Sequence, residues 1–117
     1  MDALKIIIVD DETRVRTSLR HLISMYYPTA TVVAEAGDVE SAFTEITKHS
    51  PDVVLLDIQL SGRSGFELLQ KLVPVNFKLI FVTAFNQYAL QAFKFSAIDY
   101  LLKPVNPEDL VSALQKA

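Results

Sequence analysis

The chain has 117 residues, of which 50% are apolar and 21% are charged, and its net charge is −3. A chain of this length is the size of one domain and can bury a hydrophobic core without disulfides or structural metals. Its 11 Lys and Arg residues are scattered singly, which argues against nucleic-acid binding by this chain alone, because such binding needs a concentrated basic face. Cysteine is absent, so disulfides, thiolate metal sites and cysteine nucleophiles are excluded.

The beginning of the chain predicts no membrane or targeting segment. The apolar run from Ile6 to Val9 is too short to span a bilayer. The residues around it lack the basic region and the cleavable apolar core of a signal peptide. We therefore expect a cytoplasmic protein.

The pattern of apolar residues predicts five strands that alternate with five helices. In chain order, we expect a strand over 4–9, a helix over 12–26, a strand over 31–34, a helix that follows Asp38 and is closed by Pro51, a strand over 53–56, a helix after Ser64, a strand over 77–82, a helix over 86–95, a strand over 97–102 and a helix after Asn106. The strands are β-branched or apolar runs, and the helices carry apolar side chains at helical spacing. This alternation predicts an α/β fold, with a parallel sheet covered by helices on both faces and right-handed crossovers.

Capping signals support the expected starts of three helices. Asp38 and Asn106 are residue types that favour the N-cap, and Pro107 is suited to the first helical position. Ser64 is followed three residues later by Glu67, which matches a capping box. No repeat or interdomain linker interrupts the pattern, so we read residues 1–117 as one domain and expect any output domain to lie outside this chain.

Four of the five expected strands run directly into polar residues, which are Asp10 with Asp11, Asp57, Thr83 and Lys103. The carboxyl ends of parallel strands share one edge of an open sheet, where ligands bind, so we expect these side chains to converge on one cleft. Clustered carboxylates repel one another unless a cation lies among them, and a small all-oxygen site favours Mg²⁺ over Zn²⁺. One carboxylate there could attack phosphorus, while the metal and Lys103 neutralise the developing charge.

Each of these residues also has a purely structural explanation when it is taken alone. An acidic pair before a helix is most often a cap, and an Asp that closes a buried strand is usually a turn residue. Thr83 is a good strand former, and a single Lys at a strand end is normally solvated. Their coincidence at four strand ends favours a functional site.

Four segments carry a specific pattern in their order and spacing: Ile-Ile-Val-Asp-Asp-Glu (7–12), Val-Leu-Leu-Asp-Ile-Gln-Leu (54–60), Phe-Val-Thr-Ala (81–84) and Asp-Tyr-Leu-Leu-Lys-Pro (99–104). In addition, Gly65 lies eight residues after Asp57. With these segments the chain resembles, essentially from end to end, the CheY-like receiver domains of two-component response regulators. The resemblance implies a flavodoxin-like fold with strand order 2-1-3-4-5.

The same resemblance implies which residues bind the metal and accept the phosphoryl group. Asp57 would be the phosphoacceptor. Asp10 and Asp11 would form an acidic pocket for Mg²⁺, with Asp11 the more direct ligand. Asp57 and the backbone carbonyl of Gln59 would complete the ligand set.

Three further residues receive roles from the resemblance. Thr83 and Lys103 would contact the phosphoryl oxygens, and the bond between Lys103 and Pro104 is expected to be cis. Tyr100 matches the switch aromatic, which turns inward when the Thr83 hydroxyl moves toward the phosphoryl group.

The function implied is a phosphorylation-dependent signalling switch that receives its phosphoryl group from a sensor histidine kinase. Such a domain is not an enzyme on other substrates, because it catalyses only its own phosphorylation and dephosphorylation. The fourth helix, the fifth strand and the fifth helix would form the readout face, where dimers could form. Residues 83–104 are similar to regulators that control transcription through a LytTR-type DNA-binding domain, so contact with DNA would come from an output domain outside this chain.

The chain departs from the family pattern in the loop after Asp57. Ser61 stands where many members have Pro, and Ser64 stands where many have Asp, so we expect this loop and its partner choice to differ. His21 and His49 are expected to be exposed bystanders, which leaves the phosphodonor histidine to another protein.

Two other functions compete with the phosphorylated switch. One is an interaction module with a receiver fold that is never phosphorylated, although such a module has no reason to keep all five polar groups. The other is an aspartyl-phosphate hydrolase. Those enzymes usually carry a second Asp two residues after the nucleophile as general acid, and here that position is Gln59, which cannot donate a proton in that role.

Overall fold

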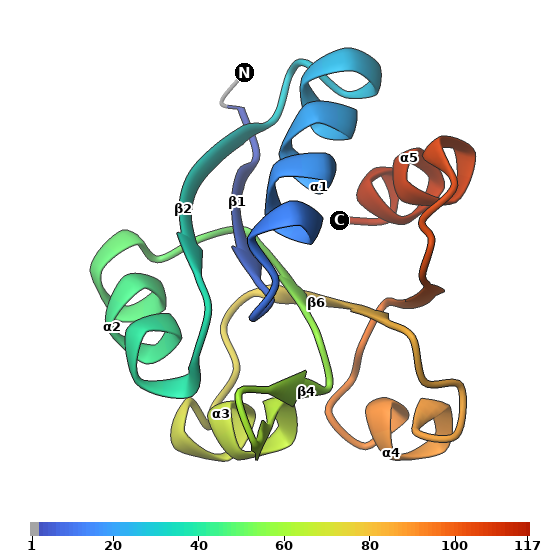
Figure 1. The fold of residues 1–117 in the computed structure, drawn as a ribbon. Coiled ribbons are helices and arrows are strands. Elements are labelled where there is room, and N and C mark those ends of the chain that lie inside the picture. Colours follow the sequence, from blue (N-terminus) through green and yellow to red (C-terminus); the bar gives the residue numbers. More distant parts are fainter. Residues whose placement is uncertain (1–2) are drawn as a thin grey trace.

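The structure, a computed structural model, describes residues 3–117 and is built on a five-stranded parallel sheet (Figure 1). Its strands are β1 (Lys5–Val9), β2 (Thr31–Ala36), β3 (Val53–Leu56), β6 (Lys78–Thr83) and β7 (Asp99–Leu102). They lie in the order β2-β1-β3-β6-β7, and each neighbouring pair is parallel. Counted along the chain, this is the expected order 2-1-3-4-5, so the predicted α/β fold is confirmed.

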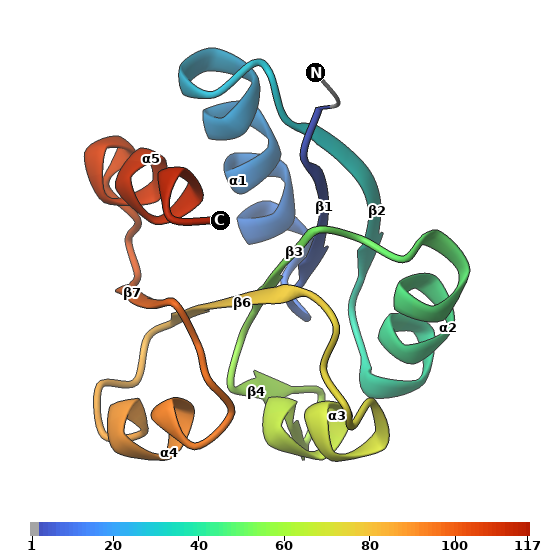
Figure 2. The same ribbon diagram turned by 180° about the vertical axis from the view of Figure 1, so that it is seen from behind.

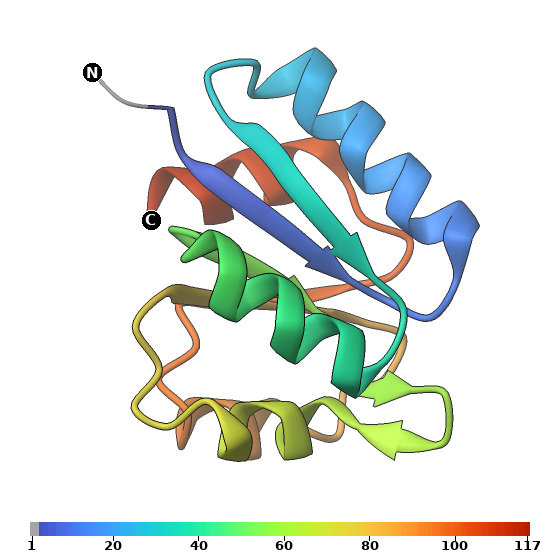
Figure 3. The ribbon, with the colours of Figure 1, turned by 90° about the vertical axis from the view of Figure 1, so that its left-hand side faces the viewer.

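Helices cover both faces of the sheet. The helices are α1 (Thr13–Tyr26), α2 (Val39–His49), α3 (Gly65–Lys71), α4 (Ala89–Phe93) and α5 (Pro107–Gln115). Helices α1 and α5 pack on one face, and α2, α3 and α4 pack on the other. Figure 3 shows α1 (blue) and α5 (red) on one side of the strands and α2 and α3 on the other.

The interior position of β1 in the sheet explains why residues 6–9 are a continuous apolar run. Ile6 and Ile8 point into the cluster under α1 and α5, whereas Ile7 and Val9 point into the cluster under α2, α3 and α4. All four side chains are at most 1% exposed. Successive side chains of a strand alternate between faces, so a strand covered on both sides is apolar throughout. Asp10 therefore follows four consecutive buried residues at the end of β1.

Most predicted boundaries lie within about two residues of the observed ones, which is ordinary scatter at element ends. The clearest difference is α4, which spans Ala89–Phe93 instead of the predicted 86–95. No side chain caps its N-terminus at Tyr88, and the preceding residues form a turn. The three predicted caps are confirmed, because Asp38, Ser64 and Asn106 each accept a backbone N–H at the start of a helix.

A short antiparallel hairpin follows Asp57, where the sequence predicted only a loop. It consists of β4 (Gln59–Leu60) and β5 (Arg63–Ser64). The two turn residues, Ser61 and Gly62, have φ angles of 49° and 82°. Positive φ at both turn positions is typical of tight hairpin turns, whereas proline is restricted to φ near −65°. The departure at Ser61 therefore has a physical reason, since proline cannot occupy this turn.

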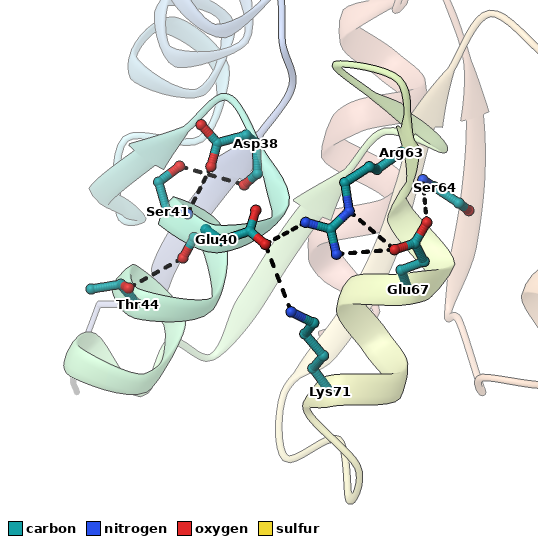
Figure 4. A network of polar contacts seen from close by, with 8 residues as sticks. All are labelled: Asp38, Glu40, Ser41, Thr44, Arg63, Ser64, Glu67 and Lys71. Carbon is teal, nitrogen blue, oxygen red and sulfur yellow. Dashed lines mark hydrogen bonds and ion pairs between the residues drawn. The ribbon is translucent and has the colours of Figure 1, made fainter.

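Arg63 fastens the hairpin between α2 and α3 (Figure 4). Its Nε and Nη2 atoms lie 3.1 and 3.0 Å from Glu67 Oε2 on α3, and its Nη1 atom pairs with Glu40 on α2. Glu67 also accepts the N–H of Ser64, which completes the predicted capping box. These groups are exposed to solvent, so the network contributes little free energy and serves mainly to orient the hairpin.

Gly65 begins α3 in direct contact with the backbone of Asp57. A Cβ atom at position 65 would overlap the Asp57 carbonyl oxygen and lie 3.3 Å from Leu56 Cγ. The Gly65 N–H also donates to the Ile58 carbonyl at 2.5 Å. Glycine is therefore required here for close approach of the helix to the end of β3.

Replacement of Gly65 with Ala is expected to lower the free energy of unfolding by about 1–3 kcal/mol, because the added methyl must push the backbone of Asp57 aside. Urea unfolding followed by circular dichroism measures this loss. Gln70→Ala, on the exposed side of the same helix, is the control and should change stability by no more than about 0.5 kcal/mol. A Gly65→Ala chain as stable as this control would show that α3 can withdraw from Asp57 without cost.

Candidate functional site

Three polar residues in the described part of the chain are buried, and all three lie at the ends of neighbouring strands. Asp10 follows β1, Asp57 follows β3, and Thr83 ends β6, with exposures of 1%, 5% and 0%. Strand β7 lies at the edge of the sheet (Figure 2). Lys103 follows this strand, and its N–H donates to the Thr83 carbonyl at 2.9 Å. The carboxyl ends of four strands thus bring two carboxylates, a hydroxyl and an ammonium to one edge.

The ammonium of Lys103 lies between the two buried carboxylates. Its Nζ atom is 2.8 Å from Asp57 Oδ2, to which it donates a hydrogen bond, and 2.7 Å from Asp10 Oδ2, which it meets as an ion pair without hydrogen-bond geometry. The second oxygen of Asp57, Oδ1, is buried and has no hydrogen-bond partner among residues 3–117. Buried carboxylate oxygens are normally satisfied, so this oxygen is free to take a ligand.

The pKa values of Asp10 and Lys103 are both shifted by burial and by the contact between these two side chains. Burial raises the pKa of Asp10, and the contact with Lys103 opposes this effect without cancelling it. For Lys103, burial alone would lower the pKa, but the interactions with Asp10 and Asp57 outweigh it and raise the pKa. Lys103 therefore stays charged, and the cluster carries an excess of negative charge that a further cation would relieve.

Asp11 is exposed and lies beside the buried pair. Its Oδ2 atom accepts the N–H of Ser61 at 3.1 Å, which ties it to the hairpin that follows Asp57. Carboxylate oxygens of Asp10, Asp11 and Glu12 lie within 4.8 Å of one another. Hard carboxylate oxygens at this spacing fit a small divalent cation such as Mg²⁺, whereas Asp57, which the sequence also predicted as a ligand, is not part of this group. Glu12 was not predicted as part of this group, and its adjacency to the acidic pair was the only sequence signal.

Thr83 and Tyr100 both bond to the main chain of Phe85. The Thr83 hydroxyl accepts the Phe85 N–H at 3.4 Å, and the Tyr100 hydroxyl donates to the Phe85 carbonyl. Tyr100 is half-buried, with its ring 5.9 Å from that of Phe81. Burial raises the pKa of Tyr100, so it remains a hydrogen-bond donor. The residue pair predicted to form a switch is therefore joined through one backbone segment.

The remaining predicted residues lie around this centre. Gln59 is exposed at the start of β4, two residues after Asp57. The Lys103–Pro104 peptide bond is cis, as expected. His21 is exposed on α1, as predicted, whereas His49 at the end of α2 is half-buried instead of exposed, with its Nε2 atom 3.4 Å from Glu45 Oε2.

Comparison with known proteins agrees with the fold. The chain belongs to the response regulator receiver domain family, whose model matches residues 6–115. It is 43% identical over 115 residues to the sensory transduction protein LytT of Bacillus anthracis, covering 97% of this chain and 46% of that protein. It is 39% identical over 116 residues to the positive alginate biosynthesis regulatory protein of Pseudomonas aeruginosa, covering 97% of this chain and 47% of that protein.

Solved structures of response regulators share the fold. The receiver domain of AraT, a response regulator from Geobacillus stearothermophilus, is 32% identical and superposes with a TM-score of 0.86, covering 97% of this chain and 92% of that one. A two-component response regulator of the LuxR family from Aurantimonas is 31% identical with a TM-score of 0.87, covering 98% and 84%. The chain spans about half the length of the curated relatives it matches. Within residues 3–117, no helix has the length and apolar character needed to cross a bilayer.

Replacement of Asp10 with Asn is expected to raise the stability of the metal-free protein at pH 7, because the folded chain otherwise holds an ionised carboxylate that burial disfavours. The pKa of Asp10 is raised on folding from its usual value of 3.8, so the folded state binds the proton more tightly. The wild-type chain should therefore lose stability relative to the variant as the pH rises from about 4 through the raised pKa.

Urea midpoints measured in EDTA between pH 4 and pH 8 test this expectation. Asp109→Asn, on the exposed first turn of α5, removes the same charge away from the site and serves as the control. An Asp10→Asn chain that is less stable than the wild type across the whole range would contradict the view that one ammonium is insufficient for both carboxylates.

Proposed function

We propose that this receiver domain is a phosphorylation-dependent switch in which Asp57 accepts a phosphoryl group from a histidine kinase in the presence of Mg²⁺. The observation that carries this proposal is the state of the Asp57 carboxylate. Lys103 holds its Oδ2 atom, while its buried Oδ1 atom has no hydrogen-bond partner among residues 3–117. One oxygen is thus oriented, and attack by the other would not have to break a hydrogen bond.

The residues fit a magnesium site of the kind that phosphoryl transfer uses. Asp10, Asp11, Asp57 and the backbone carbonyl of Gln59 would hold the ion, with Asp11 the most accessible of the three carboxylates. When bound, Mg²⁺ supplies positive charge that offsets the carboxylates and the incoming phosphoryl oxygens. The Lys103 ammonium could then leave Asp10 and contact the oxygens of the transferred phosphoryl group. The Thr83 hydroxyl would contact these phosphoryl oxygens as well.

The phosphoryl transfer needs no reactant other than the phosphohistidine of the kinase and the Asp57 carboxylate. A lone pair on the free Asp57 oxygen forms a bond to phosphorus as the bond between phosphorus and the imidazole nitrogen of the kinase breaks. The electron pair of that bond leaves with the imidazole. The product is an acyl phosphate, which water later cleaves to restore the carboxylate. The domain therefore acts on its own side chain and releases no product from another substrate.

Phosphorylation would change the surface through Thr83, Phe85 and Tyr100. If the Thr83 hydroxyl turns to the phosphoryl group, it gives up its hydrogen bond with the Phe85 N–H, which frees the segment that also holds Tyr100. Such a change shifts a pre-existing equilibrium between two arrangements. The readout face would be α4, β7 and α5, where Leu90 and Phe93 are 80% and 70% exposed.

The output of the switch would lie in the rest of a longer protein. The similarity to LytT and to the alginate regulator, and the coverage of about half of each, support a transcriptional regulator with a LytTR-type DNA-binding domain beyond this chain. The protein would act in the cytoplasm, where its kinase presents phosphohistidine.

Incubation with a small phosphodonor such as acetyl phosphate is expected to add one phosphoryl group to the chain, and only in the presence of Mg²⁺. Intact-mass analysis under mild conditions measures the addition. Asp57→Ala should take up none, whereas Asp109→Ala, an exposed acid on α5, should behave like the wild type. Equal uptake by the Asp57→Ala chain would refute the acceptor assignment.

The competing functions are separated by two further measurements. An interaction module without phosphorylation should show no amide shifts on addition of Mg²⁺ and beryllofluoride, which imitates an acyl phosphate. A hydrolase should instead release phosphate continuously from phosphate esters. We expect shifts around Asp57 and Thr83, and no steady-state turnover.

Beryllofluoride is also expected to promote a dimer through the exposed apolar residues of the readout face. Phe93→Ser should abolish this dimer without preventing the amide shifts at Asp57, because Phe93 lies on the surface of α4. Val73→Ser, which changes an apolar residue that is 67% exposed outside this face, is the matched control. Light scattering after size exclusion measures the mass, and a Phe93→Ser chain that still dimerises would place the interface elsewhere.

A further inference from the structure

Arg16 lies near the start of α1, and each of the three nitrogens of its guanidinium group contacts a partner near Asp10. Its Nη1 atom donates to the main-chain carbonyl of Asp10 at 2.5 Å, and its Nη2 atom donates to Thr13 Oγ1 at 3.1 Å. Its Nε atom lies 3.3 Å from Glu35 Oε1 on β2. The side chain is only 18% exposed, unlike an ordinary solvated arginine on a helix surface.

The carbonyl that Arg16 holds belongs to the peptide between the two acidic residues. A peptide group is planar, so fixing the direction of the Asp10 carbonyl also fixes the direction of the Asp11 N–H. The N–H of Asp10 is held separately, because it donates to the Ala36 carbonyl at 3.0 Å. The main chain of Asp10 is thus fastened on both sides, by the end of β2 and by Arg16.

Two neighbouring residues, Glu35 and Gly37, accommodate the guanidinium group of Arg16. Glu35 is 22% exposed and pairs with Arg16 and also with Arg20, whose Nη1 atom lies 2.5 Å from Glu35 Oε2. A Cβ atom at Gly37 would lie 3.2 Å from Arg16 Nη1, so the absence of a side chain at Gly37 leaves room for the guanidinium group. A lysine has one charged nitrogen on a flexible stem and cannot reproduce this three-way fork.

We propose that Arg16 is a positioning residue for the acidic pocket. By holding the Asp10 carbonyl, it sets the direction in which the Asp10 and Asp11 carboxylates leave the main chain, and so it sets the affinity of the pocket for a divalent cation. This inference rests on the proposed function, because it assumes that the pocket binds Mg²⁺. It assigns to Arg16 no contact with the metal or with the phosphoryl group.

If Arg16 acted only through its charge, its removal would change cation affinity in the opposite direction. The sign of the change in affinity therefore tests the inference. The positive charge of Arg16 lies close to the acidic pocket and repels a cation, so loss of this charge by itself would tighten cation binding. Loss of positioning would weaken it. Arg20 provides a matched control, because it is a charged residue on the same helix with the same partner, Glu35, and it makes no contact with Asp10.

The experiment compares the wild type with Arg16→Ala, Arg16→Lys and Arg20→Ala by calorimetric titration with Mg²⁺, with urea unfolding in parallel. Arg16→Ala and Arg16→Lys are expected to weaken Mg²⁺ binding about tenfold, as is usual for residues that support metal ligands. Arg20→Ala should leave the affinity within about twofold of the wild type, because it disturbs only the exposed end of the network. The Lys variant keeps the charge and decides the outcome if the Ala variant does not fold.

A second readout needs no metal. The Asp11 amide shares its peptide group with the Asp10 carbonyl, so its ¹H–¹⁵N resonance in EDTA should shift in both Arg16 variants and stay in place in Arg20→Ala. Unchanged or tighter Mg²⁺ binding in folded Arg16 variants would overturn the role of Arg16 and leave the proposed function intact. A wild-type chain that binds no Mg²⁺ would instead overturn the proposed function, whatever the Asp11 resonance does.

Discussion

The shared ammonium of Lys103 is the interaction on which the rest of the site depends. It reaches from the edge strand to two buried carboxylates, at 2.7 Å from Asp10 and 2.8 Å from Asp57. Removal of either acid group from water is costly, and a buried charge is tolerated only when it is paired. Because one positive charge faces two negative ones, the folded chain retains an electrostatic imbalance at the sheet edge. Under the proposed function, that imbalance is what attracts a divalent cation to the site.

The sheet makes this imbalance possible by fixing the ends of its strands. β1 and β3 are neighbours and are buried on both faces, so Asp10 and Asp57 cannot move apart to relieve their repulsion. Asp11, in contrast, is exposed, and within residues 3–117 its carboxylate accepts a hydrogen bond only from the N–H of Ser61. The acidic pocket thus combines a rigid inner carboxylate with an adaptable outer one. Such a combination suits a small cation that keeps several water ligands.

The centre of the site could be predicted from sequence because each strand end is marked by a change from apolar residues to a polar one. Apolar runs that stop abruptly at Asp57, Thr83 and Lys103 mark positions that any parallel sheet brings to one edge. The hairpin after Asp57 could not be predicted, because its two-residue strands depend on positive φ angles at Ser61 and Gly62. The contacts of Arg16 could not be predicted either. A basic residue on the polar side of an amphipathic helix is usually solvated, and the sequence does not show which partners it has. The metal ligands and the switch residues stay predictions that experiments must test.

The fastening of the hairpin by Arg63 differs in kind from the fastening of the sheet. The strands are held by buried apolar packing and backbone hydrogen bonds, on which dissolved ions have little effect. Arg63, Glu40 and Glu67 are exposed, and mobile ions screen such charges over a Debye length of about 8 Å at physiological ionic strength. A rise in ionic strength therefore weakens the ion pairs that hold the hairpin beside Asp57 while it leaves the sheet almost unchanged, so the position of this hairpin depends on salt more than the strand ends do.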